Sequence, residues 1–162
     1  MKIQFRVAKK EDLDFMKKML YEAVYWRSSS DKPSFEDGLA LEGVLNAIID
    51  WGKSNDIAVI AMLNGEKVGA AWFRTYTELA NIRGYIDSQT PVLVAAVEQR
   101  YRRQGIAKKM IKRLIEKYKD SEFDRLSLCV SKDNHALRLY HQLGFVEAED
   151  IGDSLIMIYS LK

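Results

Sequence analysis

The sequence predicts an α/β (α+β) fold in which one mixed, mostly antiparallel, twisted sheet carries helices on both faces. Three observations support this prediction. Residues 92–97 (VLVAAV) form an unbroken apolar run, which is typical of a strand buried on both faces. Asn64-Gly65 separates two strand-like runs, and this dipeptide is the strongest short-range signal for a hairpin. From Ile106 onward, apolar residues recur at every fourth position, as on an amphipathic helix.

The size and charge of the chain indicate one domain over residues 1–162. A chain of 162 residues can bury about 70% of its unfolded surface. Lys and Arg number 25 against 23 Asp and Glu, so the net charge of +2 does not indicate a nucleic-acid partner. Residues 100–119 hold nine basic residues, yet these mostly form the solvated face of a helix with few aromatic residues between them. We therefore expect no nucleic-acid partner.

Other features limit the class of protein. Cys129, the only cysteine, lies in an apolar run and is expected to be a small buried side chain. The sequence contains no Cys/His spacing typical of a metal site, so no metal is expected. It has no apolar run near 18 residues and no apolar segment at its start, so we expect a cytoplasmic protein without a membrane partner.

The first third of the chain predicts one strand and two helices. Apolar and polar residues alternate over 3–7, which indicates a half-buried strand. An acidic first turn and an apolar stripe predict a helix over 11–24. Residues 28–33 have the composition of a loop. Ser34 can cap a second helix, which is expected to run to Trp51-Gly52.

The middle of the chain predicts a hairpin beside the central strand. Residues 57–63 and 68–76 are the two hairpin strands. Residues 77–90 lack clear periodicity and are expected to form a loop, which is where functional residues often lie. The run at 92–97 is placed at the centre of the sheet, with the antiparallel hairpin on one side.

The last third predicts two helices and two strands. After the helix that begins at Ile106, residues 126–130 form a strand that lies parallel to the central one, on its other side. A short helix over 134–142 is ended by the segment 143–145 (LGF), and an alternating strand over 154–161 closes the chain. The expected order of elements is therefore β-α-α-β-β-β-α-β-α-β.

The turn between the central strand and the following helix predicts an anion site. Residues 102–107 (RRQGIA) have the pattern R-x-x-G-x-A. The start of a helix offers unpaired N–H groups and a partial positive charge, and Gly105 lets the backbone approach a phosphate without a Cβ. The glycine spacings of a P-loop and of the dinucleotide fingerprint are both missing. Taken alone, the pattern is a weak indication of a phosphate site.

A second motif makes the first one specific. Residues 134–145 (NHALRLYHQLGF) contain N-x-A-x-x-x-Y followed by L-G-F. Together the two motifs resemble the signatures of the GNAT superfamily, the acyl-CoA-dependent N-acyltransferases, in the same order and spacing. The resemblance implies a GNAT-like acyl-CoA N-acyltransferase fold over nearly the whole chain. It also implies acetyl-CoA as cosubstrate, a small-molecule or peptide amine as acceptor, and it allows a homodimer.

The resemblance further implies the roles of individual residues. The backbone at Ala95 and Val97 would line the pantetheine arm, and Asn134 would hydrogen-bond the pantetheine region. Tyr140 would lie near the sulfur and protonate the leaving thiolate, and a phenol with an ordinary pKa of about 10 is protonated at neutral pH. The side chains of Arg102, Arg103 and Lys108 would meet the phosphates. Backbone N–H groups would hold the pyrophosphate, and these belong to Arg103, Gln104, Gly105, Ile106, Ala107 and Lys108.

Simpler interpretations remain open for these residues. Tyr140 could be a core tyrosine, and Asn134 could cap a helix. Glu98 is the residue chosen as general base, because an acidic residue is common there in the family; Asp87 and Glu78 are weaker candidates. The acceptor site would lie between the first two helices and the loop 77–90.

The predicted function is an N-acetyltransferase in which a primary amine attacks acetyl-CoA directly and Tyr140 is the general acid. The alternative is a non-catalytic acyl-CoA-binding or regulatory module of the same fold. A third interpretation is an interaction protein that binds acidic partners through its basic helix. The sequence does not identify the acceptor.

Overall fold

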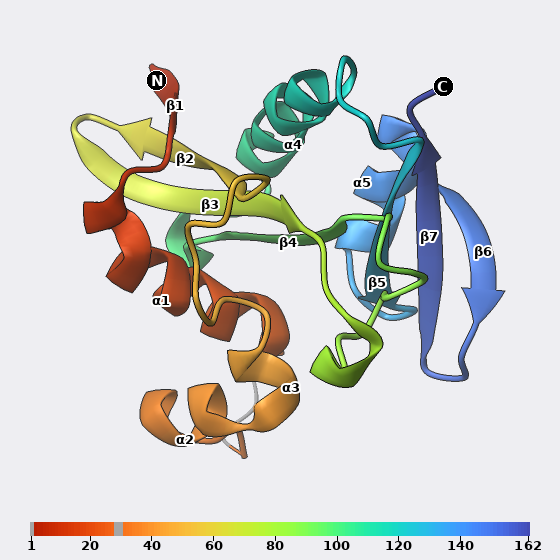
Figure 1. Ribbon diagram of the computed structural model, residues 1–162. Coiled ribbons are helices and arrows are strands. Elements are labelled where there is room, and N and C mark those ends of the chain that lie inside the picture. Colours follow the sequence, from red (N-terminus) through yellow and green to blue (C-terminus); the bar gives the residue numbers. More distant parts are fainter. Residues whose placement is uncertain (1, 28–30) are drawn as a thin grey trace.

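A computed structural model of the protein describes residues 2–27 and 31–162, so the loop predicted over 28–33 lies partly outside the described residues. The described chain forms a seven-stranded sheet in the order β1-β2-β3-β4-β5-β7-β6 (Figure 1). Only the pair β4–β5 is parallel among the strand pairs of this sheet. The predicted mixed, mostly antiparallel sheet with the 92–97 run at its centre is confirmed. The strands are β1 (Ile3–Val7), β2 (Ile57–Leu63), β3 (Glu66–Arg74), β4 (Val92–Val97), β5 (Arg125–Ser131), β6 (Val146–Asp150) and β7 (Ser154–Ser160).

Helices cover both faces of the sheet, as predicted. On one face α1 buries Met16, Met19 and Leu20 against alternate residues of β2 and β3, including Trp72. On the other face α4 covers the intervening residues of the same strands, including Phe73, and α5 covers β5. Side chains that alternate along each strand therefore separate into two hydrophobic clusters. The helices are α1 (Leu13–Val24), α2 (Phe35–Ala40), α3 (Glu42–Leu45), α4 (Ile106–Tyr118) and α5 (Ala136–Leu143).

The sheet is split at its centre, between β4 and β5. β4 pairs with β3 along its whole length, over residues 92–97. It pairs with β5 only at Val92 and Ser127, where the Ser127 N–H donates to the Pro91 carbonyl at 2.9 Å. Beyond this point the two strands run in clearly different directions (Figure 1). The split leaves one edge of β4 without a neighbouring strand.

The prediction of one continuous second helix to Trp51-Gly52 is wrong. The backbone is extended at Leu41, with φ −62° and ψ 132°, which separates α2 from the four-residue α3. Gly38 has low helix propensity and packs against two tyrosine rings, and the Tyr25 hydroxyl donates to its carbonyl at 3.1 Å. Tertiary contacts therefore outweigh the apolar stripe that predicted one continuous helix. The predicted cap is confirmed, because the Ser34 Oγ accepts from the backbone N–H of residue 37 at 3.2 Å.

The sequence analysis also missed β6. All five of its residues (VEAED) are exposed, and the sequence analysis did not use their short alternation of Val146 and Ala148 with glutamates. The strand forms because it pairs with β7, with a bulge between Glu147 and Glu149. Charged side chains are typical of an edge strand, where they discourage pairing with other chains.

Candidate active site

A cleft of about 920 Å³ lies where β4 and β5 separate. Residues from both sides of the sheet line it. Ala95 and Tyr140 belong to the side covered by α4 and α5, whereas Val94 and Ala96 belong to the side covered by α1. The cleft therefore reaches both faces of the sheet, so that two ligands could meet in it from opposite sides.

The open edge of β4 presents backbone hydrogen-bonding groups to this cleft. Successive residues of a strand direct their N–H and C=O groups to opposite sides. The Glu98 N–H donates to the Val68 carbonyl on the β3 side, whereas the Pro91 carbonyl faces β5. Odd-numbered residues of β4 therefore direct their backbone groups toward the split. Ala95 and Val97, which were predicted to line the pantetheine arm, are two of these residues and both line the cleft.

The turn before α4 forms an open cradle. Gly105 has φ 80°, and a Cβ added there would meet no atom within 4 Å. Ile106, Ala107 and Lys108 form the first turn of α4 and also line the cleft, and the N–H groups of a first helical turn have no partner inside the helix. This open space and these donors suit a phosphate group, so the turn fits the pyrophosphate of acetyl-CoA. Gln104 is exposed and does not line the cleft.

The arginine side chains of this turn make protein contacts. The Arg102 Nε donates to the Val97 carbonyl at 3.0 Å, and its Nη2 donates to Glu22 Oε2 at 3.2 Å. Arg102 thereby connects the end of β4 to α1. The Arg103 Nη2 lies 2.6 Å from His135 Nε2, which connects the turn to the start of α5. Both arginines line the cleft while holding its walls together.

Asn134 has the capping role and also faces the cleft. Its Oδ1 accepts from the Ala136 N–H at 2.9 Å, and its carbonyl accepts from the Leu137 N–H at 3.1 Å. The helix α5 begins at Ala136, two residues later than predicted. His135 occupies the N-cap position without a capping side-chain bond, and the Asn134 side chain binds the first helical N–H in its place. Its Nδ2 group has no partner among the described residues, and the residue lines the cleft. This leaves an amide donor available for a ligand.

Tyr140 lies on α5 with its side chain buried beside the cleft. Its ring packs edge-on against Phe145, with 5.9 Å between ring centroids. Burial raises the pKa of Tyr140 to about 12. Within residues 2–27 and 31–162, no protein group hydrogen-bonds its hydroxyl. The phenol is thus protonated over the physiological pH range and has an unused donor, while its ring also packs in the core.

The three acidic residues chosen as possible bases do not line the cleft. The Glu98 carboxylate lies 2.8 Å from the Lys18 Nζ and 3.7 Å from the Arg100 Nε. Asp87 accepts hydrogen bonds from Arg125 and Thr90, which lower its pKa. Glu78 belongs to a short 3₁₀ turn. None of the three carboxylates therefore belongs to the set of residues that lines the cleft.

Two charged residues that the sequence analysis missed do line the cleft. Glu22 of α1 is the one carboxylate-bearing residue that lines the cleft in the described part of the chain. A signal for it existed, since it is the only charged residue in the segment 19–26 (MLYEAVYW). Arg83, in the loop between β3 and β4, has no comparable signal, because only the folded loop places it against β5. Cys129 also lines the cleft, half-buried instead of fully buried.

The described residues contain no group of three or more His, Cys, Asp or Glu side chains that could hold a metal ion. In the same part of the chain, no helix is long and apolar enough to span a membrane.

Comparisons with known proteins agree with this geometry. The sequence model of the Acetyltransferase (GNAT) family matches residues 20–145. No curated protein sequence matches the chain. Among solved structures, an N-acetyltransferase from Staphylococcus aureus superposes with a TM-score of 0.71 at 20% identity, over 100% of both chains.

Two further solved structures are similar and contain a ligand. A putative acetyltransferase from Salmonella typhimurium, with its cofactor acetyl-CoA, has a TM-score of 0.69 at 19% identity, over 99% of this chain and 94% of that one. An N-acetyltransferase from Thermoplasma acidophilum, in complex with coenzyme A, has a TM-score of 0.70 at 15% identity, over 99% of both chains.

Proposed function

Because this chain belongs to the acetyltransferase (GNAT) family, we propose that it transfers an acetyl group from acetyl-CoA to a primary amine by direct attack. The observation that carries the proposal is the cleft through the split sheet. It combines an anion cradle at the start of α4, an unpaired strand edge and the buried phenol of Tyr140. The acetyl-CoA and coenzyme A in two similar structures support the choice of donor.

Different residues of the cleft bind different parts of acetyl-CoA. The N–H groups from Arg103 to Lys108 bind the pyrophosphate, and the backbone at Ala95 and Val97 hydrogen-bonds the pantetheine arm. Acetyl-CoA supplies a thioester carbonyl for the amine to attack. A backbone N–H of β4 polarises this carbonyl, since a fixed donor in a water-poor cleft stabilises the charge that develops on the oxygen. Tyr140 donates its proton toward the sulfur.

Glu22 is the proposed acceptor of the proton that the amine must lose. It replaces Glu98 in this role, because Glu22 lines the cleft and Glu98 does not. Its ion pair with Arg102 at 3.2 Å holds the carboxylate beside the end of β4. We propose that the proton travels through a water molecule, since a carboxylate can act as a base through one water.

Glu22→Gln is expected to lower kcat/KM for the acceptor about tenfold at pH 7. This lies below the usual range for a positioned base, because bulk water can partly replace a carboxylate that acts through water. The deficit should shrink above pH 9, where the amine loses its proton in solution. The matched control is Glu98→Gln, which removes a carboxylate that also pairs with a cation, Lys18, at 2.8 Å. A large loss in Glu98→Gln alone would restore Glu98 as the base.

The proposed function is tested by cofactor binding and turnover on the same protein. Acetyl-CoA at one hundred times its Kd should stabilise the fold by about 2.7 kcal/mol. For a chain of this size the midpoint of thermal unfolding should rise by roughly 5–11 °C. Release of free thiol in the presence of an amine panel then measures transfer. If millimolar acetyl-CoA produces no shift, the proposal is wrong.

Gly105→Val is expected to weaken acetyl-CoA binding about tenfold, because its branched side chain would occupy the open space of the cradle. The substitution also strains the backbone, since φ is 80° there. Gly65→Val is the matched control: it has φ 82°, also has no atom within 4 Å of a Cβ, and lies in the distant β2–β3 hairpin. Both variants should lose similar stability, and at acetyl-CoA one hundred times the wild-type Kd only Gly105→Val should lose about half of the acetyl-CoA shift. Equal shifts in the two variants would place the pyrophosphate elsewhere.

A further inference from the structure

The charged residues of the cleft are few and unevenly placed. Arg103 and Lys108 belong to the phosphate cradle, and Arg102 is paired with Glu22. Arg83 is the remaining charged residue among those that line the described cleft. The other residues on the α1 side are mostly apolar or uncharged, and they include Trp26, Leu41, Val44, Ile82, Val94 and Ser131.

The fold holds Arg83 at the edge of β5. The neighbouring Gly84 is packed so closely that an added Cβ would lie 3.0 Å from the Cys129 backbone nitrogen. The buried Ser127 Oγ donates to the Gly84 carbonyl at 2.8 Å. These contacts fix the loop on β5 and so hold the backbone next to Arg83 at the cleft, while the Arg83 side chain is 61% exposed.

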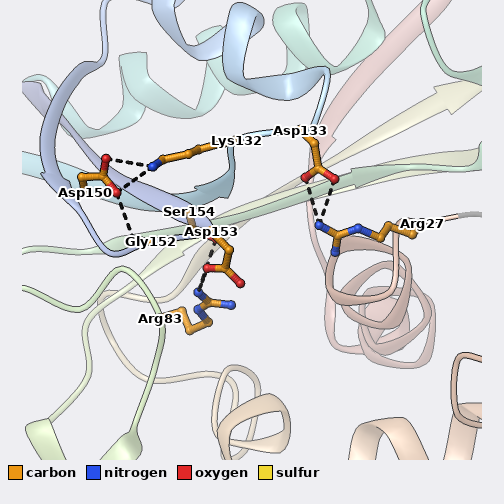
Figure 2. Close-up of polar contacts among 8 residues, drawn as sticks. All are labelled: Arg27, Arg83, Lys132, Asp133, Asp150, Gly152, Asp153 and Ser154. Carbon is orange, nitrogen blue, oxygen red and sulfur yellow. Dashed lines mark hydrogen bonds and ion pairs between the residues drawn. The ribbon is translucent and has the colours of Figure 1, made fainter.

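The guanidinium of Arg83 is only partly engaged. Figure 2 shows it directed toward Asp153, in the turn before β7. Its Nη2 donates to Asp153 Oδ1 at 3.1 Å and to Ser154 Oγ at 3.3 Å. Neither its Nε nor its Nη1 donates to an oxygen atom of the residues that the structure describes, and the guanidinium also contacts the Cys129 thiol, which is only a weak hydrogen-bond acceptor. A guanidinium with a free edge can bind a carboxylate through two parallel hydrogen bonds.

We propose that Arg83 binds a carboxylate of the acceptor, so that the acceptor is a small amino acid or a similar amine that carries a carboxylate. This inference rests on the proposed N-acetyltransferase function. A polyamine is disfavoured, because each additional ammonium group needs a counter-charge when it leaves water. The described cleft is lined by one carboxylate-bearing residue, Glu22, and by four basic residues (Arg83, Arg102, Arg103 and Lys108), so its lining offers no counter-charge for a second ammonium group. The uncharged remainder of this side accommodates the acceptor side chain.

The test compares acceptors that differ only in the carboxylate. The twenty L-amino acids and spermidine are assayed first, and the best amino acid is then compared with its own amide. We expect kcat/KM to favour the free acid by about 10–100-fold, the size of one charge-assisted contact. The α-ammonium group of the amide is more acidic than that of the free acid, so more of the amide is present as the reactive neutral amine. Differences in amine protonation would therefore favour the amide and cannot produce this result.

Arg83→Gln should reduce this preference to threefold or less. Titration calorimetry in the presence of coenzyme A should show a matching loss of amino-acid affinity, which is a readout independent of turnover. Lys132→Gln is the control, because Lys132 is also exposed and pairs with an aspartate, Asp150, at 2.8 Å (Figure 2), but does not line the cleft. It should keep the full preference.

Three outcomes would overturn the assignment of Arg83. These are spermidine as the best acceptor, an unchanged preference in Arg83→Gln, and failure of all twenty amino acids to bind or react. If acetyl-CoA still raises the unfolding midpoint in any of these cases, the proposed donor site stands and only the acceptor class is wrong. Absence of that shift would instead remove the proposed function itself.

Discussion

Tyr140→Phe is expected to lower kcat about a hundredfold and to leave the affinity for acetyl-CoA unchanged. The substitution removes one hydroxyl from the wall of the cleft and keeps the ring that packs against Phe145. The fold and the cofactor site should therefore persist, and only the hydrogen bond to the departing sulfur should be lost. Steady-state kinetics and the acetyl-CoA shift in unfolding midpoint measure the two effects separately.

The expected hundredfold decrease in kcat follows from the acidity of the Tyr140 phenol. The pKa of Tyr140 is raised to about 12, whereas a thiol has a pKa of about 8.5. Complete proton transfer to a free thiolate would therefore be unfavourable by about 5 kcal/mol. Tyr140 acts mainly as a hydrogen-bond donor to the developing charge, so we expect a value at the lower end of the range for an acid catalyst.

The pH dependence gives a second check on Tyr140. The proton donor is the neutral phenol, which persists up to a pH near its raised pKa of about 12. Deprotonation of Tyr140 should therefore not lower the turnover rate at saturating substrate between pH 8 and about pH 10.5. Tyr101→Phe is the control, since Tyr101 also lines the cleft. If both variants keep wild-type turnover, the sulfur takes its proton from water or from the acceptor.

Asp56→Ala is expected to destabilise the fold by about 3–5 kcal/mol, the usual cost of leaving one member of a buried ion pair alone. Asp56 and Arg74 side chains are 4% and 3% exposed, with 3.1 Å between Oδ1 and Nε. Asp56 Oδ2 also accepts the N–H groups of Gly52 and Lys53, each at 2.9 Å. The Arg74 Nη2 is already buried without a partner among the described residues, so the lone guanidinium would be poorly compensated. Chemical denaturation measures the change.

Two further variants sharpen this prediction. Glu116→Ala removes an exposed ion pair, in which the Glu116 side chain is 65% exposed and the Lys119 side chain 48% exposed. It should lower the free energy of unfolding by at most about 1 kcal/mol. The double variant Asp56→Ala/Arg74→Met should be less destabilised than Asp56→Ala, because it removes the unpaired buried charge. A double variant as unstable as the sum of both single changes would show that packing, and not charge, dominates at this position.

Local patterns were sufficient to predict most elements of the fold. The apolar run of β4, the Asn64-Gly65 hairpin and the stripe of α4 each depend on neighbours in sequence, and all three are found in the structure. The exceptions depend on distant contacts. The second helix is interrupted at Leu41, three residues after Gly38, which packs on the rings of Tyr21 and Tyr25, and β6 exists only because β7 pairs with it.

The same distinction applies to the candidate site. Asn134 and Tyr140 could be predicted as candidates because both lie within one short motif, and both line the cleft. The candidate base could not be found in this way. Glu98 follows β4 directly, yet its side chain pairs with Lys18 outside the cleft, whereas Glu22 reaches the cleft only because α1 docks across the sheet. Arg83 similarly depends on the packing of its loop against β5.

The single residue pair that joins β4 to β5 has a mechanical consequence. Elsewhere each strand is tied to its neighbours by a ladder of hydrogen bonds, but β4 and β5 are paired at one position only, beside the Ser127–Pro91 hydrogen bond. The ladder is interrupted where the pantetheine arm is proposed to lie. In the complex, acetyl-CoA would make the hydrogen bonds to β4 that a neighbouring strand makes elsewhere in the sheet. Binding should therefore stiffen the molecule across its middle, and slower amide exchange at Ala95 and Val97 would reveal it.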